Sequence, residues 1–298
     1  MTRVQANLLL LLTGAIWGAG FVAQSTAMDA LTPLWFIAIR FAIATMVAAP
    51  LALFEARRAS TQLTPLGIGN FVWVGLALFG GAVTQQFGLL TTTVTNSGFL
   101  TGLYVVFVPI LTVLVLRKQP HWIIWPTALM ATFGIFLLSG GALATLTTGD
   151  LLTIVCAFFW AVQIMLAGVF VAGGRPFALS MTQFAVCSAG GALLALIFEP
   201  FSLDALLNTL PEVLYSGIFS SGLAFILQVV GQRYTTAPQA AIFLSSEALF
   251  AALFGVVLLG ENIPPIGYAG CAIIFAAMLL VELVPELGKS RKSAPAGA

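Results

Sequence analysis

The chain has 298 residues, of which 60% are hydrophobic and only 7% are charged, and its net charge is +1. Soluble domains carry about 25% charged residues, so this composition excludes an ordinary water-soluble protein. The small net charge and the lack of a long basic run exclude nucleic acid as a partner. The lipid bilayer is the solvent that fits.

Ten apolar runs follow one another along the chain, each near the roughly 20 residues that a membrane-spanning helix needs. We expect helices, because a helix satisfies its own backbone polar groups, whereas the strands of a membrane barrel would alternate in hydrophobicity. Between the runs, only residues 199–212 could hold extra structure. The runs are 8–27, 33–54, 66–90, 95–116, 122–141, 151–172, 177–198, 210–232, 237–259 and 265–284.

The charges between the runs predict the orientation. Ten of the eleven basic residues fall in the N-terminal segment, the C-terminal tail and every second connection, and the other connections carry acidic residues only. The positive-inside rule makes the basic side cytoplasmic. Both termini are then cytoplasmic, and the even number of spans agrees with this orientation.

The chain repeats itself at an offset of 143 residues. We therefore expect two halves of five spans, 1–144 and 145–298, the second with a short cytoplasmic tail. Because five is odd, the second half must be inverted in the membrane. Inverted repeats are common in secondary transporters, whose substrate site lies near the midplane between the halves. The matching pairs are Trp17/Trp160, Pro33/Pro176, Gln85/Gln228, Gly88/Gly231, Thr92/Thr235 and Thr93/Thr236.

Six spans carry stripes of amides, hydroxyls and aromatic rings, which are costly in lipid unless they face one another. We predict that these stripes line a substrate cavity. The alternative is hydrogen bonding or packing between helices, which we expect of some glutamines. The predicted substrate-binding residues are Trp17, Gln24, Gln85, Tyr104, Trp160, Gln163, Gln228, Gln232 and Glu247. Runs 122–141 and 265–284 lack such stripes and are expected outside the cavity.

Two ionisable side chains lie well inside spans, where charges are costly and usually have a partner. Arg40 lies near the external end of its span, and a structural clamp is the favoured interpretation, with a charge site as the alternative. Glu247 lies near mid-span and could contact substrate, carry a proton or brace a neighbouring helix. Pro109 interrupts the fourth span and is either a hinge or a fixed kink.

Signatures of catalysis, nucleotide binding and metal binding are absent from the sequence. We therefore expect no enzyme activity, no cofactor and no metal. A membrane-embedded enzyme or a lipid flippase would need a polar cluster at one interface. A purely structural subunit would not need Glu247 in mid-span.

These features resemble the ten-helix drug/metabolite transporter superfamily, specifically its EamA-type members. One departure is Ala248, where many relatives have proline. The residues that carry the resemblance are Gly14-Ala-Ile-Trp17-Gly18 with Phe21, Pro33 with Arg40-Phe41, Leu103-Tyr104 with Pro109, and Ser246-Glu247 followed by Leu259-Gly260-Glu261.

The resemblance implies an ATP-independent carrier of small metabolites, often an exporter, in the bacterial inner membrane. The YddG-type branch, which the chain resembles most, favours aromatic and other large neutral amino acids. An exporter of drugs or quaternary cations is the alternative. The sequence leaves the direction of flux, proton coupling and oligomeric state open.

Overall fold

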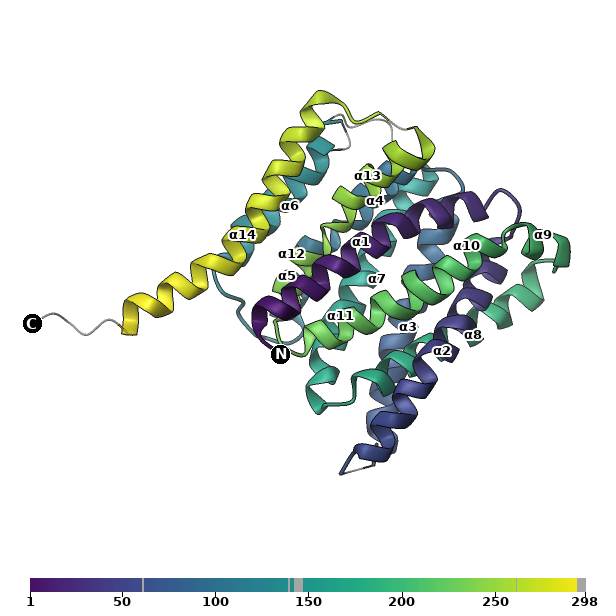
Figure 1. Cartoon of the computed structure of the whole chain (residues 1–298), viewed down its shortest axis with the longest axis horizontal. Helices are drawn as coiled ribbons and strands as arrows, with labels where there is room; N and C mark the ends of the chain where they lie inside the picture. Colours follow the sequence, from purple (N-terminus) through teal and green to yellow (C-terminus); the bar gives the residue numbers. More distant parts are fainter. Residues whose placement is uncertain (61, 139, 142–146, 261, 294–298) are drawn as a thin grey trace, which may run out of the picture.

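The computed structural model describes residues 1–60, 62–138, 140–141, 147–260 and 262–293, and these are all-helical (Figure 1). The expected boundary at 144/145, Glu261 and residues 294–298 lie outside the described residues. The elements are α1 (Arg3–Ala27), α2 (Pro33–Arg58), α3 (Pro65–Gly88), α4 (Val94–Thr101), α5 (Tyr104–Leu114), α6 (Ile124–Leu138), α7 (Thr148–Phe170), the 3₁₀ turn η1 (Val171–Gly173), α8 (Pro176–Phe198), α9 (Leu203–Asn208), α10 (Leu210–Tyr215), the π-helix η2 (Ser216–Leu223), α11 (Ala224–Gln232), α12 (Ala237–Leu244), α13 (Glu247–Leu259) and α14 (Pro265–Ser293).

The structure confirms the all-helical prediction. Within the described residues, nine segments are long and apolar enough to cross a membrane, and α6 is a shorter apolar helix. These ten segments match the ten apolar runs in order. The connection at 199–212 holds α9, the extra structure that its length allowed. Figure 1 shows the N-terminus and the C-terminal end of α14 on the same side of the bundle, as an even number of spans requires.

The repeated threonines begin equivalent helices in the two halves. Thr93 accepts a hydrogen bond from the backbone N–H of Asn96 and so caps α4, and Thr236 caps α12 in the same way through Gln239. A threonine oxygen at this position satisfies a backbone N–H that a helix start leaves unpaired. The repeat motif therefore starts the fourth helix of each half.

The fourth span of each half is broken, and the two breaks are related by the same offset of 143. One lies between α4 and α5 at Gly102–Leu103, and the other lies between α12 and α13 at Ser245–Ser246. At each break the hydrogen bonds run from residue i+3 to residue i, as in a 3₁₀ turn. A 3₁₀ turn inside a long helix often marks a functional hinge.

Pro109 lies within the fourth span, but the span is not broken there. Helix α5 continues through Pro109, and the break lies earlier, at Gly102–Leu103. A proline removes one backbone hydrogen bond, but its fixed φ is helical, so a helix held by packing can continue through it. Whether Pro109 acts as a hinge stays a prediction.

Glycines allow two pairs of helices to approach closely. A Cβ atom built on Gly18 of α1 would lie 2.4 Å from Phe250 Cβ of α13, and one built on Gly270 of α14 would lie 2.3 Å from the Gly134 oxygen of α6. Helices α6 and α14 pack together at one edge of the bundle (Figure 1). Neither contributes to the cavity described below, as the sequence predicted.

Candidate functional site

A small cavity lies between the two halves and is lined by residues of both. Its volume is about 30 Å³, counted as the space that the centre of a water molecule can reach. That is room for roughly two water molecules. Pockets for drug-sized ligands measure about 300–1,000 Å³, so this conformation is contracted. The lining residues are Trp17, Phe21, Gln24, Arg40, Gln85, Thr101, Tyr104, Trp160, Ile164, Ser220, Phe225 and Glu247.

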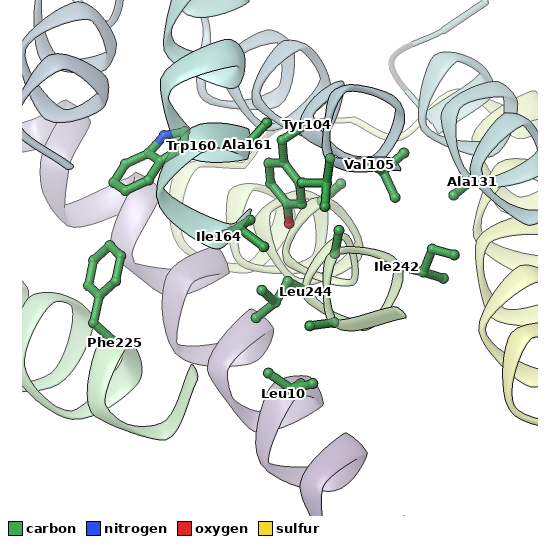
Figure 2. Packing of buried hydrophobic residues seen from close by; sticks show 14 of the residues in the cluster. Leu10, Tyr104, Val105, Ala131, Trp160, Ala161, Ile164, Phe225, Ile242 and Leu244 are labelled. Atoms are coloured by element: carbon green, nitrogen blue, oxygen red, sulfur yellow. The ribbon is translucent and has the colours of Figure 1, made fainter. Parts of the chain in front are cut away.

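Three aromatic rings form one wall of the cavity. The ring centroids of Trp17 and Phe225 are 4.8 Å apart, and those of Trp160 and Phe225 are 5.5 Å apart and stacked. Figure 2 shows Trp160 and Phe225 facing each other from α7 and α11. Trp17 donates its indole N–H to the Ser220 carbonyl of the π-helix at 2.9 Å. The wall therefore combines apolar ring faces with tryptophans held in fixed orientations.

Gln85 presents one end of its amide to the cavity. Its Oε1 accepts from Trp160 Nε1 at 2.9 Å and from the Cys156 thiol at 3.5 Å. Two donors on one oxygen determine which way the amide points. Among the described residues, Gln85 Nε2 donates to no partner, so this N–H group is available to a ligand.

Arg40 lies in the cavity wall, and the residue is only 3% exposed. Nη1 donates to Gln24 Oε1 at 2.7 Å, and the guanidinium carbon lies 4.8 Å from the centroid of the Phe41 ring. Arg40 forms no ion pair with an acidic side chain of the described residues, and Nε has no hydrogen-bond partner there. A buried cation without an anion is costly, so the site favours a negatively charged group.

Tyr104 and Glu247 occupy equivalent positions in the two repeats, because 247 and 104 differ by 143. Each is the first residue after a break, Tyr104 in α5 and Glu247 in α13. They are 1% and 3% exposed. The two groups lie close enough to interact, yet within the described residues Tyr104 Oη and Glu247 Oε1 make no hydrogen bond of good geometry.

Glu247 is the first residue of α13 and is buried beside the break between α12 and α13. Because Oε1 is buried without a donor, the Glu247 carboxyl can still accept hydrogen bonds from a ligand. A substrate cation or ammonium group would meet this requirement. The cavity therefore carries one acidic and one basic group, Glu247 and Arg40, and neither forms an ion pair with another side chain of the described residues.

Six of the nine predicted substrate-binding residues line the cavity: Trp17, Gln24, Gln85, Tyr104, Trp160 and Glu247. The other three lie in a buried glutamine network that joins α7, α8 and α11. Gln228 Nε2 donates to Gln163 Oε1 at 3.0 Å, and Gln163 Nε2 donates to Gln183 Oε1 at 3.0 Å. Gln232 bonds the Ile164 carbonyl. In this conformation these amides bond neighbouring helices, the alternative expected for some glutamines.

Ser220 lines the cavity together with Phe225, five positions further along the chain. That offset places two residues on different faces of an α-helix but on nearly the same face where i→i+5 bonding applies. The π-helix spans Ser216–Leu223 and so turns both toward the cavity. No site role was predicted for Thr101 and Ile164, which give no signal beyond being apolar or small, or for Phe21, which was named only among the residues that carry the family resemblance.

A second, larger hollow opens on the basic side of the molecule. It measures about 740 Å³ by the same measure, and its lining includes Arg3, Lys118 and Arg233. These basic residues identify it as the cytoplasmic side. Ile164 lines the small cavity while the next residue, Met165, lines this cytoplasmic vestibule. The two spaces therefore border the same turn of α7.

Buried apolar side chains pack beside the cavity wall at Ile164. Leu10, Ile164 and Leu244 belong to one buried cluster, and Figure 2 shows them on the side of Tyr104 to which its hydroxyl points.

Comparisons with known proteins agree with this architecture. Residues 4–140 and 147–283 each match the model of the EamA-like transporter family. The chain is 30% identical over 282 residues to an uncharacterized transporter of Archaeoglobus fulgidus, covering 94% of this chain and 87% of that protein. It is 24% identical over 298 residues to the uncharacterized transporter YwfM of Bacillus subtilis, covering 97% of each.

A solved crystal structure superposes on this chain with a TM-score of 0.79 over 95% of this chain and 99% of that one. The two sequences are 20% identical, so the likeness is one of fold alone. The sequence matches identify the family, and the substrate must be argued from the chemistry of the cavity.

Proposed function

The chain belongs to the EamA-like transporter family, and we propose that it exports small amphipathic metabolites, in particular aromatic and other large neutral amino acids. It would act as a secondary transporter in the inner membrane and work by alternating access between two inverted halves. That it is a multi-pass membrane transporter follows from the family. Its substrate and its direction are our proposal.

The observation that carries the proposal is the pairing of Arg40 and Glu247 in one cavity with an aromatic wall. A neutral amino acid is a zwitterion with a carboxylate, an ammonium group and an apolar side chain. The guanidinium of Arg40 would bind the carboxylate, which it can do through two parallel hydrogen bonds. Glu247 would bind the ammonium group, and Trp17, Trp160 and Phe225 would stack on the side chain.

The cytoplasmic vestibule supports export rather than uptake. Its basic lining, which includes Arg3, Lys118 and Arg233, would raise the local concentration of molecules that carry a carboxylate. The substrate would then separate the apolar contacts around Ile164 and enter the central cavity, which is contracted before it arrives.

A quaternary-cation exporter is the second candidate, because Glu247 with two tryptophans also makes a cation site. Arg40 disfavours it: an unpaired guanidinium in the same small cavity repels a permanent cation. A bound amino acid would provide a partner for both Arg40 and Glu247, whereas a bound cation would provide one for Glu247 only.

Counterflow in proteoliposomes tests the choice. We expect unlabelled phenylalanine, trapped inside, to drive accumulation of labelled phenylalanine, with leucine and tryptophan competing. Tetraphenylphosphonium should neither compete nor be transported. Transport of the lipophilic cation without any transport of neutral amino acids would contradict the proposal and favour the second candidate. Protein-free liposomes give the background.

Replacing Trp160 with alanine should lower phenylalanine counterflow roughly tenfold, because a stacking surface is lost and the Gln85 oxygen loses one of its two donors. The matched control is Trp73→Ala in α3, since Trp73 is 64% exposed and faces away from the cavity. Initial rates should be compared at equal amounts of reconstituted protein. Equal rates in the two variants would remove Trp160 from the substrate site.

A further inference from the structure

The external ends of α3 and α7 are joined by a short hydrogen bond. The Thr92 hydroxyl, just after α3, donates to Asp150 Oδ1 in the first turn of α7 at 2.6 Å. Asp150 is 5% exposed, and its other oxygen accepts from the backbone N–H of Thr147 at 2.9 Å. The carboxylate is thus fixed by its own helix start and holds Thr92 from the neighbouring helix.

The backbones beneath this bond are in direct contact. A Cβ atom built on Gly149 would lie 2.4 Å from the Gly88 oxygen, and one built on Gly88 would lie 2.7 Å from Thr153 Oγ1. Neither position has room for a methyl group. The external side is therefore closed by the meeting of α3 and α7.

The offset of 143 residues maps this contact onto the cytoplasmic side. Thr92 corresponds to Thr235 and Asp150 to Asn7, while Gly88 corresponds to Gly231 and Gly149 to Ala6. The equivalent helices, α11 and α1, approach each other in the same manner but less closely. A Cβ atom on Gly231 would lie 3.4 Å from the Ala6 oxygen, whereas one on Gly88 would lie 3.0 Å from the Gly149 oxygen.

The cytoplasmic counterpart of the hydrogen bond is not formed. In the described part of the chain, Asn7 Oδ1 and Thr235 Oγ1 are both buried and have no hydrogen-bond partner. Asn7 uses only its amide nitrogen, which donates to Glu282 Oε2 at 2.7 Å. Thr235 lines the open vestibule. An unbonded hydroxyl just after α11 and an unbonded amide oxygen on α1 thus occupy the positions of Thr92 and Asp150, on helices that touch less closely than α3 and α7.

We propose that Thr92–Asp150 and Thr235–Asn7 are two repeat-related latches that form alternately. The first holds the external side closed while the vestibule is open, as in this structure. The second forms when α11 and α1 close the cytoplasmic side and the first latch breaks. Two inverted halves that exchange conformations exchange these contacts as well. The four residues position the gates and do not touch the substrate.

The two latches differ in strength. The external latch is a bond to a carboxylate, which is about twice as strong as a bond between neutral groups. The cytoplasmic latch joins a hydroxyl and an amide. In addition, Gly149 permits a closer approach than Ala6 can. The resting protein should therefore favour the state that is open to the cytoplasm.

Matched valine substitutions test the proposal, because each removes one hydroxyl and keeps the shape. The reporter is Thr101→Cys in a variant without the native Cys156, Cys187 and Cys271. Thr101 lines the cavity, and its hydroxyl has no hydrogen-bond partner among the described residues. The measured quantity is the ratio of its labelling rates by a membrane-impermeant thiol reagent added to the external or to the cytoplasmic side.

Thr92→Val should raise the external-to-cytoplasmic ratio about tenfold, and Thr235→Val should lower it about threefold. Thr235→Ser, which keeps the hydroxyl, should restore the parent ratio. The control Thr132→Val removes a hydroxyl that bonds its own helix in α6 and should leave the ratio unchanged. An unchanged ratio in Thr235→Val, or a shift in the same direction as Thr92→Val, overturns the proposal. No substrate is added, so the result does not depend on the proposed amino-acid specificity.

Discussion

Replacing Arg40 with glutamine is expected to lower phenylalanine transport at subsaturating concentration by at least about 100-fold. Two hydrogen bonds from a guanidinium to a carboxylate contribute about 1.5–3 kcal/mol each, and about 1.4 kcal/mol corresponds to a factor of ten. Glutamine is also the residue at the equivalent position of the second half, Gln183, where it is fully buried. The loss should fall mainly on KM, since the missing group binds the substrate.

A purely structural Arg40 would give a different pattern. Phenethylamine, which lacks the carboxylate, should compete with labelled phenylalanine no worse in the Arg40→Gln variant than in the parent. A structural clamp would instead weaken the binding of both compounds together. Arg57→Gln, at an exposed position of the same helix, is the matched control and should transport like the parent. If phenylalanine and phenethylamine lost the same amount of affinity, Arg40 would have a structural role and would not bind the carboxylate.

The membrane fold could be predicted from the sequence because its determinants are local. The ten apolar runs reflect the cost of an unsatisfied backbone in lipid, which each helix meets within its own segment. The repeat was visible because Gln85, Gly88 and Thr92 recur as Gln228, Gly231 and Thr235 without a gap. The structure adds that these motifs lie where α3 and α11 end and the capped fourth helices begin.

The helix breaks could not be predicted, because they depend on contacts between distant segments. The break at Ser245–Ser246 packs against α1, where a Cβ atom on Gly14 would lie 2.2 Å from Ser246 Oγ. No local signal marks that approach. The sequence did contain one indication of where the breaks lie. Tyr104 and Glu247 occupy equivalent positions in the repeats, and equivalent positions in an inverted pair can meet at the midplane.

Part of the site could be predicted, and the rest failed for a geometrical reason. Trp17 and Trp160 lie in mid-span at equivalent positions, so the pseudo-symmetry of the halves brings the two side chains together. Their ring centroids are 6.4 Å apart. Gln228 was assigned to the cavity by assuming regular α-helical spacing. Phe225 lines the cavity, but Gln228, three residues further along the same regular helix α11, lies beyond the cavity and bonds Gln163.

Replacing Gly18 with alanine is expected to destabilise the folded protein by about 1–3 kcal/mol, as overpacking of a close contact does. The added Cβ would lie 2.6 Å from the backbone nitrogen of Ala251 as well as 2.4 Å from Phe250 Cβ. Backbone atoms cannot rotate away, so α1 and α13 must separate. That separation would also displace the neighbouring Trp17 and lower transport.

The control for this substitution is Gly69→Ala in α3, where a Cβ atom would have no neighbour within 4 Å. Alanine there should stabilise the helix by up to about 1 kcal/mol, because glycine is the weaker helix former. Thermal unfolding in detergent, followed by loss of the monodisperse peak in size-exclusion chromatography, should therefore shift in opposite directions for the two variants. If Gly18→Ala matched Gly69→Ala, α1 and α13 would not be in close contact. The cavity between them, with Trp17 on one side and Glu247 on the other, would then need a different geometry.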